Sequence, residues 1–164
     1  LHTTGYGVID CDKNALTLIE GGVIVPGRSS ALADRLAELQ RSLSEIIASL
    51  APDVMVVEDV FSRSAYPRTA ILMAHARGAL VCAAGLQNVP VFNYAATAVK
   101  RALVGSGAAT KEQVALMVVQ CLRLRRPPSP PDVTDALALA IAHGRRALKH
   151  AAHAPLASRR RAAR

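Results

Sequence analysis

The segment PPDVTDALALAIAHG, residues 130–144, places two carboxylates, Asp132 and Asp135, three residues apart at the start of a long apolar run. Positions i and i+3 of a helix lie on one face, so a helix here would present both acids from its first turn. Either acid could simply cap the helix, where negative charge is favoured. Because one cap needs only one side chain, the second acid calls for a partner such as a metal ion.

A third acid, Glu58, follows the apolar run VMVV, which is typical of a buried strand. Ligands of α/β sheets collect at the carboxyl ends of strands, so Glu58 is placed to meet Asp132 and Asp135. The next residue, Asp59, would point to the opposite face of the strand. Carboxylate oxygens suit Mg²⁺ or Mn²⁺, and two such ions about 3.5 to 4 Å apart can activate water for phosphodiester cleavage. The acids therefore predict a two-ion hydrolytic site.

Five short strands are expected from the alternation and length of the apolar runs. Turn signals at Asp-Lys-Asn and Gly-Gly separate the first three into an antiparallel meander. The remaining two are continuous apolar runs of the kind that a buried strand shows. The expected strands cover residues 6–11, 15–20, 22–25, 54–58 and 89–95.

Helices are expected between and after these strands. The leucine and isoleucine spacing in 32–50 predicts a helix with a serine cap that ends before Pro52. Thr110 and Gln113 stand in capping-box register at the start of another. The other expected helices cover 67–84, 96–104 and the segment after the proline-rich loop RRPPSPPD. Strands followed by alternating helices and strands indicate an α/β domain with a mixed sheet.

The composition constrains the partners and the compartment. Twenty Lys and Arg residues against twelve Asp and Glu residues give a net charge of +8, which favours a phosphate-backbone partner such as DNA. No uninterrupted apolar stretch reaches the roughly 20 residues that cross a bilayer, and the start lacks a signal-peptide pattern, so we expect a cytoplasmic protein without membrane contact. Residues 1–150 are expected to form one domain, and 151–164 a basic, disordered tail.

Several motifs occur in the order seen in RuvC-type Holliday-junction resolvases, and the resemblance extends to about residue 146. They are TGYGVID, VVEDVF, HARG, PVFNYA, VKRALVGSGAATKEQV and DVTDALALAIAH. The resemblance implies a ribonuclease H-like fold with a mixed five-stranded sheet flanked by helices. It also implies a homodimer that nicks four-way DNA junctions in pairs with Mg²⁺, during recombination and repair. Junction branch-migration proteins are the further partners that it implies.

In that family four acids form the catalytic site, and three of them map onto Glu58, Asp132 and Asp135. The fourth stands in a strand with an Asp-Pro-Gly-Leu motif ahead of the segment matching TTGYG, whereas this sequence opens at Leu1. We therefore expect a truncated or mis-started sequence, or one that lacks its leading residues, rather than a natural loss of the strand. Without that strand, the strand at 6–11 would expose backbone donors and acceptors along an edge.

The resemblance also assigns residues to DNA. Lys100 and Lys111 match family lysines near the scissile phosphate, where a cation stabilises developing charge. Phe61 matches an aromatic residue that contacts bases near the crossover, although a single Phe is more often part of a core. Arg63 and Arg68 could hold the DNA backbone, but their loop, SRSAYPR, departs from the family pattern.

Two other functions compete with junction cleavage. A catalytically impaired junction-binding protein of the same fold would keep Phe61 and the basic surface without a full set of acids. A nucleotide-binding relative such as a sugar kinase would need a second lobe, for which 164 residues leave no room. His143 lies about 16 Å along the helix axis from Asp132, so it is expected to be structural or interfacial rather than a shared metal ligand.

Overall fold

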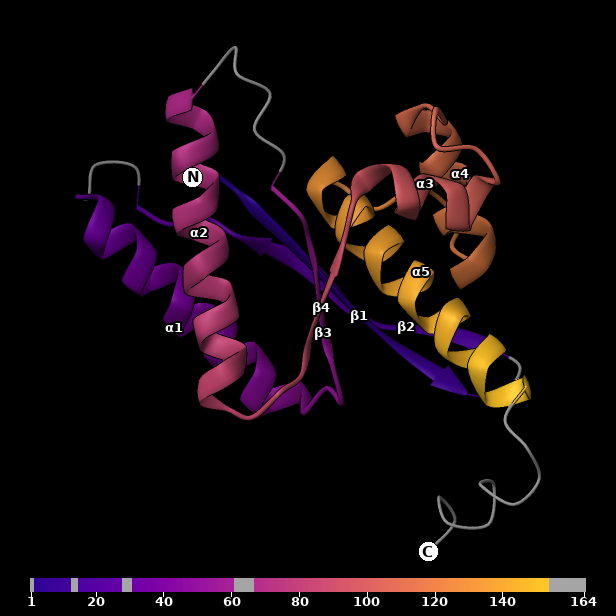
Figure 1. Ribbon diagram of the computed structural model, residues 1–164, viewed down its shortest axis with the longest axis horizontal. Coiled ribbons are helices and arrows are strands. Elements are labelled where there is room, and N and C mark those ends of the chain that lie inside the picture. The colour runs from indigo at the N-terminus through magenta and orange to yellow at the C-terminus, as the bar shows by residue number, and fades with distance from the viewer. Residues whose placement is uncertain (1, 13–14, 28–30, 61–66, 154–164) are drawn as a thin grey trace, which may run out of the picture.

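The computed structural model describes residues 2–12, 15–27, 31–60 and 67–153. Four strands and five helices lie in these ranges (Figure 1). In chain order they are β1 (Thr4–Asp12), β2 (Ala15–Ile24), α1 (Leu32–Leu50), β3 (Met55–Glu58), α2 (Pro67–Leu86), β4 (Val91–Tyr94), α3 (Ala96–Val104), α4 (Lys111–Leu122) and α5 (Pro131–His153).

β1 and β2 form one antiparallel hairpin, so the expected three-stranded meander is wrong. The Gly-Gly pair that was expected to be a turn lies inside β2, where Gly21 pairs with Gly7 and Gly22 with Tyr6. A side chain on Gly22 would lie 2.8 Å from the Tyr6 hydroxyl oxygen, and one on Gly21 would lie 3.0 Å from Val133 of α5. The glycines therefore mark close packing within a continuous strand.

β3 and β4 form a parallel pair in which Glu58 is opposite Tyr94. The strand set is therefore mixed, which confirms the α/β class. The described residues contain four strands in two two-stranded sheets, not the five strands expected from the sequence. The count differs because residues 15–24 form one strand instead of two.

The helices cover the strands from two sides (Figure 1). α1 and α2 lie together on one side, and α3, α4 and α5 lie on the other. One core joins Ile24 of β2 to Leu39 and Leu43 of α1 and to Ala83 and Ala84 of α2. The second core centres on α5 and contains residues of α3 and α4, among them Val99, Leu103, Val118, Leu137 and Ile141.

The helix ends follow the sequence signals only in part. Thr110 and Gln113 form the expected capping box of α4. The serine cap of α1 is wrong, because Ala31 is the N-cap and makes no side-chain capping bond. α2 continues through Gly85 to Leu86, where a β-carbon on the glycine would have open space. α5 runs to His153, into the expected tail, and residues 154–164 lie outside the described part of the chain.

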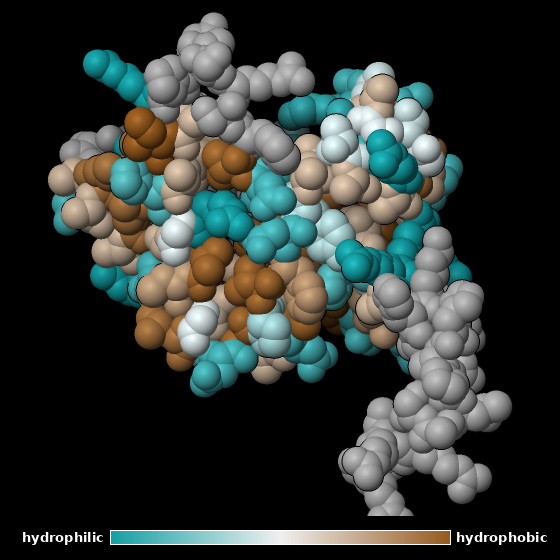
Figure 2. All heavy atoms as spheres, in the orientation of Figure 1, coloured by the Kyte–Doolittle hydropathy of each residue, from teal (hydrophilic) through white to brown (hydrophobic). Residues whose placement is uncertain are grey.

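α2 has an unusual surface. Among the described residues, one helical segment is long and apolar enough to cross a membrane, by length and composition alone. This segment is Arg68–Leu86 of α2. Core helices of soluble proteins pass the same test, and Arg77 interrupts the apolar sequence. Much of the helix is nevertheless uncovered, with Ile71 56% and Leu86 70% exposed. Figure 2 shows hydrophobic surface on the side of the molecule that carries α1 and α2.

Candidate active site

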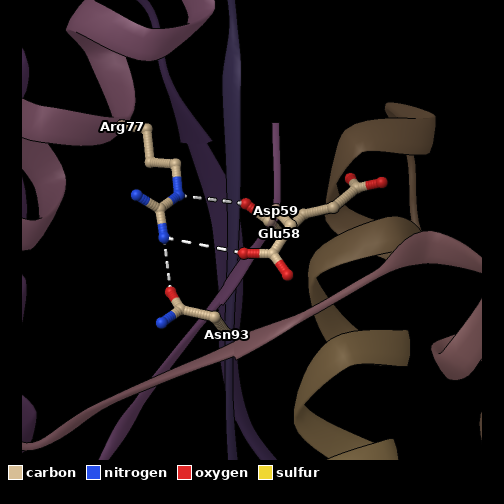
Figure 3. A network of polar contacts seen from close by, with 4 residues as sticks. All are labelled: Glu58, Asp59, Arg77 and Asn93. Atoms are coloured by element: carbon tan, nitrogen blue, oxygen red, sulfur yellow. Dashed lines mark hydrogen bonds and ion pairs between the residues drawn. The ribbon is translucent and has the colours of Figure 1, made fainter. Parts of the chain in front are cut away.

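Glu58 is the last residue of β3, and its side chain points toward α5 (Figure 3). Burial raises the pKa of its carboxyl group above the ordinary value, and the negative charge of Asp135 raises it further. The positive charges of Lys111 and Lys100 act in the opposite direction. Charged side chains of α3, α4 and α5 therefore lie near Glu58 at this strand end.

Asp135 lies in the first two turns of α5 and forms an ion pair with Lys111, whose Nζ is 3.8 Å from Asp135 Oδ2. Lys111 is the first residue of α4, directly after the Thr110 cap. The capping box thus fixes the helix end that presents this lysine. The structure brings together Glu58, Asp135 and Lys111, three residues that the sequence placed in one site.

Asp132 is exposed in the first turn of α5, one turn before Asp135. Val133 and Thr134 lie between Asp132 and Asp135. Both are buried and anchor the start of the helix. The Thr134 hydroxyl donates to the Pro128 carbonyl at 3.0 Å. β1 approaches the same turn so closely that a β-carbon on Gly5 would collide with the Asp132 carbonyl. This packing sets where α5 begins.

Asp59 points away from Glu58 toward α2 (Figure 3), which confirms the expected alternation along the strand. Its Oδ1 lies 3.8 Å from Nη2 of Arg77. Arg77 has no predicted role of its own, and the one sequence signal that includes it is the HARG motif.

The arrangement of the acidic side chains bears on metal binding. Within the described residues, no three His, Cys, Asp or Glu side chains are grouped closely enough to hold an ion. The Glu58 carboxylate is nevertheless partly buried and lies near the negative charge of Asp135, and both effects raise its pKa. A divalent cation would relieve the repulsion between these two charges, and oxygen donors of this kind fit Mg²⁺ or Mn²⁺.

Two of the remaining predicted residues lie on other helices, and Lys100 is near enough to Glu58 for its charge to act on that carboxyl group. Arg68 is exposed near the start of α2, and Lys100 is partly buried on α3. Phe61 and Arg63 lie outside the described residues.

His143 has a structural environment. Its Nδ1 is hydrogen-bonded to the Tyr94 hydroxyl at 3.0 Å, and its ring lies 4.6 Å from that of Phe92, centroid to centroid. Burial lowers the pKa of His143, and the nearby charge of Arg146 lowers it further. The histidine therefore packs α5 against β4, in keeping with the structural role expected for it.

Known proteins match both the sequence and the fold. A family model described as crossover junction endodeoxyribonuclease RuvC matches residues 1–143. RuvC of Rhodopirellula baltica is 46% identical over 141 residues, which cover 86% of this chain and 79% of the relative. RuvC of Bordetella avium is 42% identical over 143 residues, covering 87% and 78%.

Solved structures agree with this match. Thermus thermophilus RuvC superposes with a TM-score of 0.83 at 31% identity and covers 90% of each chain. The same protein in complex with a Holliday junction substrate gives a TM-score of 0.79 at 28% identity, covering 93% of this chain and 90% of that one. The expected ribonuclease H-like fold is confirmed by these likenesses. The chain belongs to the RuvC family of crossover junction endodeoxyribonucleases.

Proposed function

We propose that this chain is a structure-specific endonuclease that resolves four-way DNA junctions by hydrolysing phosphodiester bonds. The observation that carries the proposal is the family match over residues 1–143, together with a relative of the same fold that has been solved with a Holliday junction. The meeting of Glu58, Asp135 and Lys111 at one strand end supplies the acidic and basic groups that such hydrolysis needs.

Glu58, Asp132 and Asp135 are the residues proposed to hold the metal. We take the metal to be two Mg²⁺ ions per site, replaceable by Mn²⁺, which when bound would lower the pKa of a water and neutralise the leaving oxygen. The three carboxylates would hold the ions, and β3 and α5 would fix the direction from which each carboxylate approaches. Lys111 would place a positive charge beside the phosphate whose charge grows during attack.

DNA contacts are proposed for four basic residues and one phenylalanine. Lys100 and Lys111 would face the cleaved strand, and Arg68 and Arg63 would contact the backbone further away. Phe61 is proposed to stack on bases at the crossover. A net charge of +8 supports a binding mode dominated by phosphate contacts, so junction affinity should fall steeply with salt.

A homodimer is proposed, with α2 as its contact helix. α2 is apolar around its circumference, but only one side packs on α1, through residues such as Ala83 and Ala84. Ile71 and Leu86 remain more than half exposed. A second copy of the chain would cover this face, and its twofold axis would match the symmetry of a four-way junction. Branch-migration proteins as partners and a cytoplasmic location complete the proposal.

A catalytically impaired junction-binding protein is the second candidate. It is favoured by one observation: the described residues contain no group of three metal-ligating side chains. The two candidates are separated by incubating the full-length protein with a synthetic four-way junction and Mg²⁺. Paired nicks in strands of like sequence support the nuclease, whereas a stable complex without nicks supports the binding protein.

A further inference from the structure

Arg77 of α2 reaches the carboxyl ends of both β3 and β4 (Figure 3). Its Nε donates to the backbone carbonyl of Glu58 at 3.3 Å, and its Nη2 donates to Oδ1 of Asn93. The same Nη2 lies 3.8 Å from Oδ1 of Asp59. Arg77 therefore contacts the Glu58 backbone, the Asp59 side chain and, on the neighbouring strand, the Asn93 side chain.

These contacts lie at the end of a short strand pair. β3 has four residues, and the last backbone bond to its partner is from the Asp59 amide to the Tyr94 carbonyl at 2.9 Å. A guanidinium group is planar and presents its donors in a fixed fork, so it can fix several acceptors relative to one another. A lysine ammonium group at this position would lack that geometry.

Arg77 and the Glu58 side chain lie on opposite faces of β3. Arg77 acts from the α2 side, while the Glu58 carboxylate is directed toward α5 (Figure 3). A rotation of the strand end about its axis would swing the carboxylate away from Asp135. Arg77 contacts the Glu58 carbonyl and the Asp59 side chain from the α2 side, and these contacts oppose that rotation.

We propose that Arg77 is a positioning residue, which fixes the ends of β3 and β4 and thereby keeps the Glu58 carboxylate aimed at α5. This inference rests on the proposed role of Glu58 as a metal ligand. A misplacement of about 1 Å in a catalytic group can cost about 100-fold in rate, so loss of the arginine should impair metal binding and nicking. The Arg77 side chain is 31% exposed, so its role is not that of a buried core residue.

The test compares Arg77→Met and Arg77→Lys with Arg41→Met in the full-length protein. Arg41 is an exposed arginine of α1 with no hydrogen bond or ion pair within the described residues, so it is a matched control. Mn²⁺ affinity is measured by electron paramagnetic resonance, without DNA. We expect Arg77→Met to weaken Mn²⁺ binding and to slow single-turnover nicking by about 10-fold or more. Arg77→Lys should restore little, and Arg41→Met should match the wild type in both measurements.

A double-variant comparison shows whether Arg77 acts through Glu58. In a Glu58→Gln background, Arg77→Met should not weaken Mn²⁺ binding further, because the group that it positions is already changed. An undiminished effect of Arg77→Met in that background would overturn the proposal, as would wild-type Mn²⁺ affinity in Arg77→Met itself. If Glu58→Gln alone binds Mn²⁺ and nicks like the wild type, the proposed function fails instead.

Asn93→Ala provides a second route if Arg77→Met does not fold. It keeps the arginine and removes one acceptor from the β4 side. Its Mn²⁺ affinity and nicking rate should fall in the same direction as for Arg77→Met, but less, while the thermal midpoint and junction affinity in EDTA stay close to wild type. Wild-type metal affinity in Asn93→Ala would then overturn the proposal.

Discussion

Lys111 Nζ lies 3.8 Å from Asp135 Oδ2, and this ion pair joins the start of α4 to the start of α5. The two side chains are 76% and 52% exposed, so the pair contributes no more than about 1 kcal/mol to stability. The charge of Lys111 also lowers the pKa of Glu58, against the effects of burial and Asp135. Lys111 is therefore better placed to balance the acids of the site than to hold the fold together.

Lys111→Met should consequently separate activity from stability. We expect single-turnover nicking to slow by roughly 10- to 100-fold because a cation beside the phosphate is lost. The free energy of unfolding in urea should change by less than about 1 kcal/mol. Lys111→Arg keeps the charge and should retain most of the activity. A Lys111→Met protein that nicks as fast as the wild type would remove this lysine from the site.

Glu58→Gln should stabilise the metal-free protein at neutral pH. The folded-state pKa of Glu58 lies above its ordinary value of 4.5, so the folded protein holds this proton more tightly than the unfolded chain. The free energy of unfolding therefore falls as pH rises from the ordinary pKa through the folded-state pKa. A glutamine at this position does not ionise, so the variant does not lose stability in this way as pH rises. Its thermal midpoint in EDTA should therefore exceed that of the wild type at about pH 7 and converge with it near about pH 4.

Glu45→Gln, at an exposed position of α1, is the control for that measurement. It removes one carboxylate from an exposed surface and so shows whether the loss of any negative charge has the same effect. A Glu58→Gln midpoint equal to or below that of the wild type at neutral pH would contradict the destabilising environment assigned to this carboxylate.

Gly5→Ala should disturb the start of α5. A β-carbon at Gly5 would collide with the carbonyl of Asp132, and backbone cannot move aside as a flexible side chain can. We expect a loss of about 1 to 3 kcal/mol in the free energy of unfolding, together with slower nicking. Gly85→Ala meets nothing within 4 Å and should be neutral or stabilising by up to about 1 kcal/mol. Equal stability of the two variants would show that β1 and α5 are not packed this tightly.

Ile71→Glu should break the proposed dimer. The side chain is 56% exposed on α2, so a charge costs little in the monomer but would be buried against the second copy. Light scattering coupled to size exclusion should then give the mass of one chain instead of two. Leu116→Glu, at a 59% exposed position of α4, should leave the dimer intact. A wild-type protein that is monomeric at micromolar concentration would contradict the proposal.

The sequence predicted the elements that carry the site better than those that support it. The apolar run before Glu58 and the capping box at Thr110 each depend on a few adjacent residues, and both form as expected. The turn expected at Gly21 and Gly22 does not form, because their close neighbours Val133 and Tyr6 lie elsewhere in the sequence and pack against them in the fold. A Gly-Gly pair indicates a turn when it is considered alone.

The acids could be grouped from sequence because α5 and β3 each impose a simple geometry on them. Asp135 follows from helical spacing, and Glu58 follows from its place at a strand end. Arg77 could not be found in this way, since its contacts with Glu58, Asp59 and Asn93 depend on how α2 crosses the two strands. Positioning of this kind leaves no spacing pattern along the chain.

Cleavage of a synthetic four-way junction by the full-length protein tests the central claim most directly. With Mg²⁺ the wild type should make paired nicks, and EDTA should abolish them. Asp135→Asn and Glu58→Gln should nick at least about 100-fold more slowly while still binding the junction in EDTA. Nicking by Asp135→Asn at the wild-type rate would contradict the assignment of these carboxylates as the hydrolytic site.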